Sequence, residues 1–168
     1  YFATMLELLK PQANQLLKTT EKDYLDPTKF SQVEADYYNF SLPDYLSQQV
    51  MSEVKLITNQ SKPGQMIAKS PALLYQRNYE QFKIPNEYLA NSKLYNFYLA
   101  NKWAGSLFPL YYQSVDCPDC LLDKNDWAIN FTAAQLIAQD FAANQDLKNR
   151  WAKIYKVIGW FTGLRSDL

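Results

Sequence analysis

Both cysteines of the chain lie in one compact motif, Cys117-Pro118-Asp119-Cys120, whose residue types and spacing have recognised chemistry. Two thiols three positions apart can form a small disulfide, supply half of a zinc site or take part in redox exchange. A structural zinc ion requires four Cys or His ligands, and because the chain has no His and no further Cys, the other ligands would come from another chain. A thioredoxin-like role requires a surrounding strand–helix–strand pattern, which is absent here. A loop disulfide in an oxidising compartment and two ordinary thiols in a reducing one are the simpler alternatives.

Acidic residues gather in and just after the same loop, at Asp116, Asp119, Asp123 and Asp126. Two carboxylates at a suitable separation can act as the acid and the base of a hydrolase. The spacing does not fit a calcium loop, which alternates oxygen ligands around a central glycine and ends in glutamate. Solvated loop acids and helix caps, with Asp123 or Asn125 beginning the next helix, are the simpler interpretation.

Aromatic residues make up 15% of the chain, and 13 of its residues are tyrosines. Exposed aromatic faces can stack on sugars or peptides, whereas tyrosines packed between helices direct their hydroxyls to loop carbonyls. The candidates for exposed faces are Tyr37-Tyr38, Tyr111-Tyr112 and the stretch from Tyr75 to Tyr88. The absence of histidine removes the commonest general base, so any catalysis would use carboxylates, thiols or tyrosines.

The charge and the length of the chain limit its class. Lys plus Arg and Asp plus Glu each count 17, whereas a protein that binds nucleic acid carries a basic excess. We therefore predict no nucleic-acid partner. Apolar runs are too short for a membrane span, which requires about 20 residues. The 168 residues suit a single domain, and helical register from Phe2 onward and a cap-like Ser166-Asp167 near the end predict a fragment of a longer protein.

The residues that must position these groups favour helices. Leu occurs 22 times against 12 for Val and Ile together, and four glycines are too few for many tight hairpins. We predict an all-α fold, either an irregular helical bundle or part of a larger helical array. Helices are expected from the N-terminus to a break at Pro11, over residues 43–59 and from Ser92 to Trp103. Residues 19–41 are expected to form a loop with at most short helices, and residues 61–91 are expected to be mostly connection.

Three predicted helices have distinctive faces. The helix through Trp103 is apolar on most sides, with a polar stripe around Lys93, Asn96 and Asn101, which places it at the centre of the fold. Two further apolar stripes have helical spacing, one at Trp127, Phe131, Ala134, Ala138 and Phe141, the other at Leu147, Trp151, Ile154, Ile158 and Phe161. Because Asn144 lies between them as a cap, we expect an antiparallel helical hairpin at the C-terminus.

One block of the sequence resembles a known family. It reads Asn78-Tyr79-Glu80-Gln81-Phe82-Lys83, then Tyr88, then an aromatic helix with Leu94, Tyr95, Tyr98 and Trp103. It is similar to the Asp-Tyr-Ser-Gln-Phe-Lys-Pro-Arg-Gly-His-Tyr block of a bacterial and archaeal family, domain-of-unknown-function family 3160, and the segment from Trp151 to Leu168 resembles that family's closing segment. The firmest matches run from Asn78 onward. The chain has Ile84-Pro85-Asn86-Glu87 where the family has Pro-Arg-Gly-His, so no role of that Arg or His carries over.

The resemblance implies a setting but no activity. Similar proteins are longer, helical and often look exported or lipid-anchored, which raises the expectation of a disulfide between Cys117 and Cys120 and of an extracytoplasmic or cell-envelope location. We predict a helical binding or scaffolding module of a larger cell-envelope or secreted protein, with no metal and no cofactor. Its partners would be a protein or a glycan, or the missing parts of the parent chain. The predicted binding residues are Tyr79, Gln81, Phe82, Tyr88, Tyr98 and Trp103.

Two rival functions remain open at this point. One is a carboxylate-based, carbohydrate-active hydrolase on a helical toroid, which rests on fold analogy alone and is favoured less than binding. The other is a purely structural fragment whose exposed apolar faces contact the rest of the parent protein.

Overall fold

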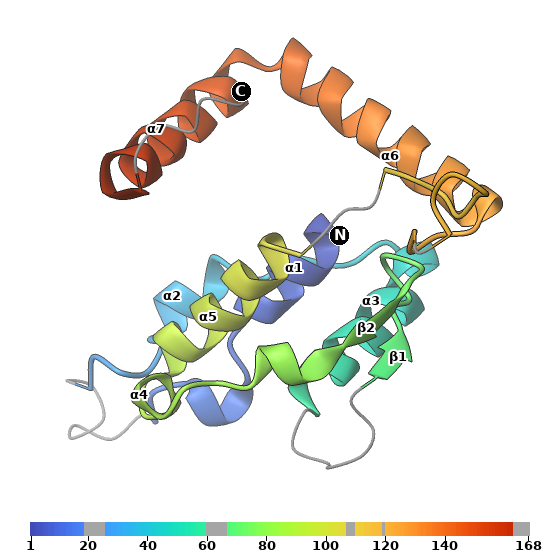
Figure 1. Ribbon diagram of the computed structural model, residues 1–168. Coiled ribbons are helices and arrows are strands. Elements are labelled where there is room, and N and C mark those ends of the chain that lie inside the picture. Colours follow the sequence, from blue (N-terminus) through green and yellow to red (C-terminus); the bar gives the residue numbers. More distant parts are fainter. Residues whose placement is uncertain (19–25, 60–66, 107–109, 119, 163–168) are drawn as a thin grey trace. The chain divides into compact units, whose positions relative to one another are not determined.

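The computed structural model describes residues 1–18, 26–59, 67–106, 110–118 and 120–162 (Figure 1). The chain divides into two compact units, Tyr1–Pro109 and Leu110–Leu168. The N-terminal unit contains α1 (Phe2–Leu9), η1 (Ala13–Gln15), α2 (Gln32–Asp36), α3 (Asp44–Thr58), β1 (Ile67–Lys69), β2 (Gln76–Asn78), η3 (Tyr79–Phe82), α4 (Asn86–Leu89) and α5 (Ser92–Ala104). The C-terminal unit contains α6 (Lys124–Ala143) and α7 (Gln145–Thr162). The expectation of one helical domain cut from a longer protein stays a prediction.

Prolines and a side-chain cap set several helix ends in the N-terminal unit. α1 stops before Lys10, which is extended (φ −66°, ψ 126°) because a residue that precedes proline avoids the helical region. α3 begins after Pro43 and ends at Thr58, which confirms the helix predicted for residues 43–59. α5 is capped by Asn91, whose side-chain oxygen accepts hydrogen bonds from two backbone N–H groups of the first turn.

The core of the N-terminal unit lies where α1, α3 and α5 meet. α1 packs against both other helices, and Figure 1 shows α1 and α5 side by side. η3 packs against α3. Burial of a large side chain contributes about 1.5–3 kcal/mol to stability. The most deeply buried apolar side chains are Ile57, Leu73, Tyr79, Phe82, Leu99 and Trp103.

The prediction of an all-α fold is wrong, because β1 and β2 form a two-stranded antiparallel sheet. Its central pair is Ala68 and Arg77. The fold is therefore an α+β mix in which helices predominate. The sheet lies within residues 61–91, which were expected to be mostly connection.

Local sequence is a poor predictor of this sheet. Each strand has three residues, and Ile67 is the one β-branched residue in the two. The loop between the strands is held from outside by Glu53 of α3, which accepts hydrogen bonds from Ser70 Oγ at 2.6 Å and from the Ala72 N–H at 3.1 Å. Leu74 in that loop has φ 67°, a conformation that a leucine rarely adopts. Tertiary contacts, rather than strand propensity, account for the hairpin.

α5 is oriented differently from the expectation. Asn96, which was expected on the polar stripe, is 4% exposed, while Leu94 and Phe97 are 43% and 59% exposed. Asn96 Nδ2 donates to the carbonyl oxygens of Leu9 and Lys10 at 3.3 and 3.2 Å. The end of a helix leaves such carbonyls without intrahelical partners, so a buried amide is favourable at this position. The helix therefore buries a polar side chain and leaves apolar ones at the surface.

The C-terminal unit has the two predicted helices but not the predicted hairpin. Asn144 joins them as expected, and its Oδ1 atom accepts a hydrogen bond from the Leu147 N–H at 3.1 Å. Figure 1 shows α6 and α7 diverging from this junction, near which the rings of Phe141 and Trp151 are in contact, with centroids 6.0 Å apart. An antiparallel helical pair needs a loop of about 2–5 residues, and here one residue separates the helices. The prediction of an antiparallel hairpin is therefore wrong.

Large apolar side chains are accessible on both α6 and α7. Ile129 and Leu136 of α6 are 59% and 57% exposed, and Ile154 of α7 is 60% exposed. Within the part of the chain that the structure describes, no helix combines the length and the apolar content that a membrane span requires.

Candidate functional site

A pocket of about 400 Å³ lies in the N-terminal unit between α2 and the first half of α5. This volume falls within the range of about 300–1,000 Å³ that is typical of ligand sites. Its polar lining comes from Glu34, Lys93 and Asn96. Its apolar lining consists of Leu9, Phe30, Tyr37, Tyr38, Leu94 and Phe97. Because most of these side chains are aromatic, we call it the aromatic pocket.

Backbone hydrogen bonds fix the segment that leads into α2. The Phe30 N–H donates to the Gln15 carbonyl at 3.0 Å, and the Leu17 N–H donates to the Phe30 carbonyl at 2.8 Å. At the start of α5, the Ser92 N–H donates to the Thr28 carbonyl at 2.8 Å. These bonds join one wall of the pocket to both η1 and α5, so the wall is positioned by the core of the unit.

A capping box begins α2. The Glu34 N–H donates to Ser31 Oγ at 3.2 Å, and the Ser31 N–H donates to Glu34 Oε2 at 2.8 Å. This reciprocal pair satisfies two of the backbone donors that a helix start leaves unpaired. Because α2 has only five residues and short helices are marginal in isolation, the capping box and the contacts to α5 account for its formation. Tyr37 and Tyr38 follow directly after the helix.

An ion pair between Glu34 and Lys93 connects α2 to α5 at the pocket. Lys93 Nζ lies 2.5 Å from Glu34 Oε1, and the two side chains are 35% and 42% exposed, respectively. The hydrogen bond from Lys93, followed by those from Ser31, lowers the pKa of Glu34 from 4.5 to about 2. Glu34 is therefore ionised at neutral pH, and its ion pair with Lys93 lies beside the aromatic walls.

The aromatic walls combine one buried ring with several accessible ones. Phe30 is 5% exposed and meets Tyr38 edge to face, with ring centroids 6.0 Å apart. Lys93 Nζ lies 5.9 Å from the centroid of the Phe30 ring. Tyr37 is 85% exposed and Phe97 is 59% exposed, so their surfaces are open to a partner.

Asn96 lines the pocket, but its amide group already forms hydrogen bonds within the protein. Besides the bonds from Nδ2 to α1, Asn96 Oδ1 accepts a hydrogen bond from Gln15 Nε2 at 2.8 Å. Both oxygens of Glu34 are likewise engaged, one by Lys93 and the other by Ser31. The pocket therefore presents to a ligand mainly apolar and aromatic surface.

A second, more polar pocket of about 250 Å³ lies in the same unit. It is lined by Gln12, Asn14, Gln15, Leu89, Ser92 and Tyr95. The Gln12 N–H donates to Gln15 Oε1 at 2.8 Å, and burial raises the pKa of Tyr95. Gln15 lines this pocket and Asn96 lines the aromatic one, and the amides of these two residues are hydrogen-bonded to each other.

Three of the six predicted binding residues belong to the core. Tyr79, Phe82 and Trp103 are 2%, 0% and 0% exposed. The ring centroids of Tyr79 and Phe82 are 6.0 Å apart, and those of Phe82 and Trp103 are 6.5 Å apart. The three rings therefore pack the segment that begins at Asn78 against α5, within the core.

The other three predicted binding residues lie nearer the surface. The rings of Tyr88 and Tyr98 stack with centroids 5.3 Å apart, and the Tyr98 hydroxyl donates to the Lys83 carbonyl at 3.3 Å. Gln81 is exposed. The block thus contacts α5 through a tyrosine pair as well as through the core. A binding role for the six residues stays a prediction.

Two buried charged residues, Glu53 and Arg77, accompany the core rings. The Tyr79 hydroxyl donates to Glu53 Oε1 at 2.6 Å, and burial together with this bond raises the pKa of Tyr79. Arg77 is 6% exposed, lies 5.2 Å from the Trp103 ring centroid and donates from Nη2 to Ser106 Oγ at 3.0 Å. Its Nε and Nη1 atoms have no hydrogen-bond partner among the described residues. The cluster connects α3, β2 and α5 within the core.

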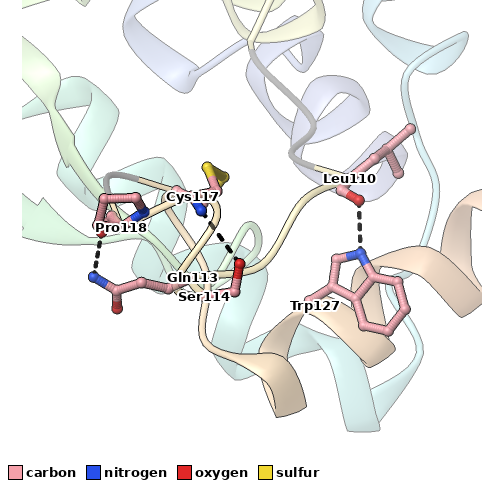
Figure 2. The surroundings of a disulfide bond; sticks show 7 residues. Leu110, Gln113, Ser114, Cys117, Pro118 and Trp127 are labelled. Atoms are coloured by element: carbon pink, nitrogen blue, oxygen red, sulfur yellow. Dashed lines mark hydrogen bonds between the residues drawn. A yellow bond between two sulfur atoms is a disulfide. The ribbon is translucent and has the colours of Figure 1, made fainter.

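Figure 2 shows the Cys117–Cys120 disulfide and its loop in the C-terminal unit; the two Cα atoms are 5.5 Å apart. The Cys117 N–H lies 3.3 Å from Ser114 Oγ, and Gln113 Nε2 donates to the Pro118 carbonyl at 2.7 Å. Of the alternatives left open by the sequence, the loop disulfide is the one found in the structure. The hydrogen bonds around the disulfide lie within the loop, so the disulfide constrains the backbone only locally.

Trp127 joins this loop to α6. Its Nε1 atom donates to the Leu110 carbonyl at 2.6 Å (Figure 2). The Trp127 ring is also 5.0 Å from that of Tyr112 and 5.2 Å from that of Phe131, centroid to centroid. The tyrosine pair Tyr111-Tyr112 therefore contributes one ring to a local cluster, while Tyr111 is 76% exposed.

The aspartates near the disulfide act mainly as loop and cap residues. Asp123 accepts hydrogen bonds from the N–H groups of Asn125 and Asp126, which confirms its predicted role as a helix cap. Asp116 is exposed, and Asp119 lies outside the described residues. In the described parts of the chain, no group of three or more Cys, Asp or Glu side chains is arranged to hold a metal ion.

Sequence reasoning named Tyr37 and Tyr38 as exposed aromatics but missed the rest of the pocket. The sequence does contain one usable signal, Ser31 followed three positions later by Glu34, which is typical of a capping box. Phe97 was missed because the surrounding helix was expected to be covered on most sides. No local pattern indicates that Lys93 pairs with Glu34 across 59 positions.

The chain matches a known family along its length. A family described as "Protein of unknown function (DUF3160)" matches residues 1–168, so the match covers the whole chain rather than its C-terminal part alone. No curated protein and no solved structure matches the chain.

Proposed function

The chain belongs to this family of proteins of unknown function, DUF3160, and we propose that it is a binding module whose aromatic pocket receives an apolar side chain of a partner protein. The observation that carries the proposal is a pocket of about 400 Å³ with accessible aromatic surface at Tyr37 and Phe97. Exposed aromatic side chains bury large areas at low cost in conformational entropy, which makes them effective contact residues.

The engagement of the polar groups favours a peptide over a glycan. A glycan needs several hydrogen-bonding groups that are free to meet its hydroxyls, in addition to an aromatic face. The oxygens of Glu34 and the amide of Asn96 are already hydrogen-bonded within the protein. An aromatic or aliphatic side chain requires only the apolar walls of the pocket.

The setting of this module is part of the same proposal. A disulfide persists in oxidising compartments, so Cys117–Cys120 supports an extracytoplasmic or cell-envelope location within a larger secreted or envelope protein. Among the acids considered for a hydrolase, Asp123 caps a helix, which gives less support to catalysis.

A titration followed by NMR tests the binding role. The isotope-labelled 168-residue chain would be mixed with capped tetrapeptides that contain Phe or Leu, with Gly-Ser tetrapeptides as negatives and with soluble oligosaccharides. We expect the amide signals of Tyr37, Tyr38 and Phe97 to shift only with the apolar peptides. The expected Kd is about 1 mM, as befits a single small side chain and its flanking peptide groups.

Two tyrosines of similar exposure give a matched pair of variants. Tyr37 in the pocket is 85% exposed, and Tyr45 on α3, outside the pocket lining, is 81% exposed. Tyr37→Ala should weaken peptide binding about fivefold, the effect of losing one aromatic contact, while Tyr45→Ala should leave it unchanged. Equal effects of both variants, or shifts with the oligosaccharides at the same residues, would contradict the proposal.

A further inference from the structure

α7 differs from the rest of the chain in its charge. Its 18 residues include Lys148, Arg150, Lys153 and Lys156 against one acid, Asp146, which gives a net charge of +3. The chain as a whole has a net charge of zero, so the remaining residues together carry −3. A strongly basic helix in a neutral chain indicates a partner with negative charge.

The same helix has a continuous apolar stripe. Leu147, Trp151 and Ile154 are 42%, 50% and 60% exposed, and at 100° per residue they fall within 60° of one another around the helix axis. The helix therefore carries bulky apolar residues along one face.

The basic residues flank that face. In the same helical projection, Lys148 and Arg150 stand on either side of the stripe, while Lys153 and Lys156 occupy the opposite face. Arg150 Nε lies 2.7 Å from Asp146 Oδ2, and both side chains are about 70% exposed, so the pair is open to solvent. Apolar residues on one face with cations beside and behind them are typical of helices that lie in a membrane interface.

We propose that α7 docks on a membrane surface that displays anionic lipid headgroups, with its axis in the plane of the interface. The stripe with Leu147, Trp151 and Ile154 would enter the boundary between headgroups and acyl chains, where tryptophan is favoured, and the flanking cations would meet the phosphates. Charge complementarity favours this occupant over a second copy of the chain, because two α7 helices would bring net charges of +3 together.

α6 provides a comparison within the same unit. Ile129 and Leu136 of α6 are 59% and 57% exposed, much as the apolar residues of α7 are. α6 has one lysine against two aspartates, Asp126 and Asp140, and therefore a net charge of −1. If apolar exposure alone caused membrane binding, both helices would contribute. If charge complementarity is required, only α7 contributes.

Vesicle co-sedimentation of the whole 168-residue chain tests the proposal. One set of vesicles contains phosphatidylcholine alone, and the other contains about one quarter phosphatidylglycerol. We expect binding to the anionic vesicles and at least about tenfold weaker binding to the neutral ones, with the difference diminishing as salt is raised. Tryptophan emission should shift to shorter wavelength on binding, and the Trp151→Phe variant should lose part of that shift.

Three double variants separate the contributions. Lys148→Gln with Arg150→Gln should weaken binding to anionic vesicles about twenty-five-fold, since each basic residue near the surface contributes a factor of about five. Leu147→Ser with Ile154→Ser should weaken it at least as much through the lost apolar contact. Ile129→Ser with Leu136→Ser on α6 should leave it unchanged. Far-UV circular dichroism of each variant shows whether the helices remain formed.

The outcomes decide the proposal. Absence of binding to anionic vesicles by a chain with intact helical content would overturn it. Equal binding to both kinds of vesicle, or unchanged binding of the variant that replaces Lys148 and Arg150, would overturn the role of charge. If the chain does not bind vesicles but self-associates, and if this self-association requires Leu147 and Ile154, the stripe would instead be a contact with a second copy of the chain. None of these results depends on the aromatic pocket.

Discussion

The two units differ in which side chains they bury. In the N-terminal unit, Glu53, Arg77 and Asn96 are at most 6% exposed, and each lies among side chains or carbonyls that it contacts. In the C-terminal unit, Phe131 and Ile154 are 39% and 60% exposed, although they belong to the regularly spaced apolar stripes of α6 and α7. Amphipathic spacing shows that a helix has a face suited to burial. It does not show that the same chain covers that face.

The comparison also shows what holds each unit together. Buried polar groups are costly without partners, so the satisfied Glu53 specifies one arrangement of α3, β2 and η3. The C-terminal unit relies on local features, namely the Asp123 cap, the Trp127 ring cluster and the disulfide. Substitutions in the first unit should therefore have large effects on stability, and matched substitutions in the second unit should have small ones.

The largest difference is expected between two tryptophans. Trp103 is 0% exposed and Trp151 is 50% exposed. Trp103→Ala should lower the free energy of unfolding by about 4 kcal/mol, because it leaves a cavity among packed rings, whereas Trp151→Ala should lower it by less than about 1 kcal/mol. Urea denaturation followed by circular dichroism measures both. Similar losses would show that α7 is covered in solution and would remove the contrast between the units.

A second pair of substitutions compares carboxylates. Glu53→Ala removes the acceptor of bonds from Ser70, Ala72 and Tyr79 and should cost about 3 kcal/mol, because buried donors lose their partner. Asp146→Ala removes an exposed ion pair and should cost at most about 0.5 kcal/mol. The same denaturation experiment applies. Tyr79→Phe, which removes one of the bonds to Glu53, should fall between the two.

The same physical difference decides how much of the fold the sequence predicts. The break at Pro11, the helix after Pro43 and the Asn144 junction follow from local backbone chemistry, and these predictions are confirmed. The β1–β2 sheet was missed because its loop depends on a carboxylate 17 to 19 residues away. The antiparallel hairpin was predicted from apolar spacing, and the single linking residue does not allow it.

The candidate site divides in the same way. Tyr37 and Tyr38 could be named as exposed aromatics, and the capping box of Ser31 and Glu34 is visible in the sequence. The inward orientation of Asn96 could not be predicted, because its partners are the carbonyls at the end of α1 and an amide from η1, 81 to 87 positions away. That orientation is what brings Leu94 and Phe97 to the surface and forms the pocket.

A third prediction concerns the disulfide, which should stabilise only its own loop. Cys117→Ser with Cys120→Ser removes a closure of very few residues, for which the chain-entropy estimate is about 2 kcal/mol. We expect faster hydrogen exchange of the backbone amides at positions 117 and 120 and in the first turn of α6. Exchange in α5 should be unchanged. Faster exchange in α5 as well would show that the disulfide affects the N-terminal unit and would contradict a local role.

The smallest expected effect concerns Glu34, whose ion pair with Lys93 is the partly exposed counterpart of the buried Glu53 cluster. Because the folded state lowers the pKa of Glu34 from 4.5 to about 2, the pair stabilises the fold fully above about pH 4.5, and the stabilisation is lost as the pH falls toward 2. Carbon-detected NMR of the Glu34 carboxyl should show this low pKa. Lys93→Gln should raise the pKa of Glu34, whereas Lys102→Gln, elsewhere on α5, should leave it unchanged. An unaltered pKa in the Lys93 variant would mean that the bonds from Ser31 hold the carboxylate alone. Salt separates the two kinds of carboxylate further, since it screens the partly exposed pair but does not reach Glu53, which is fully buried.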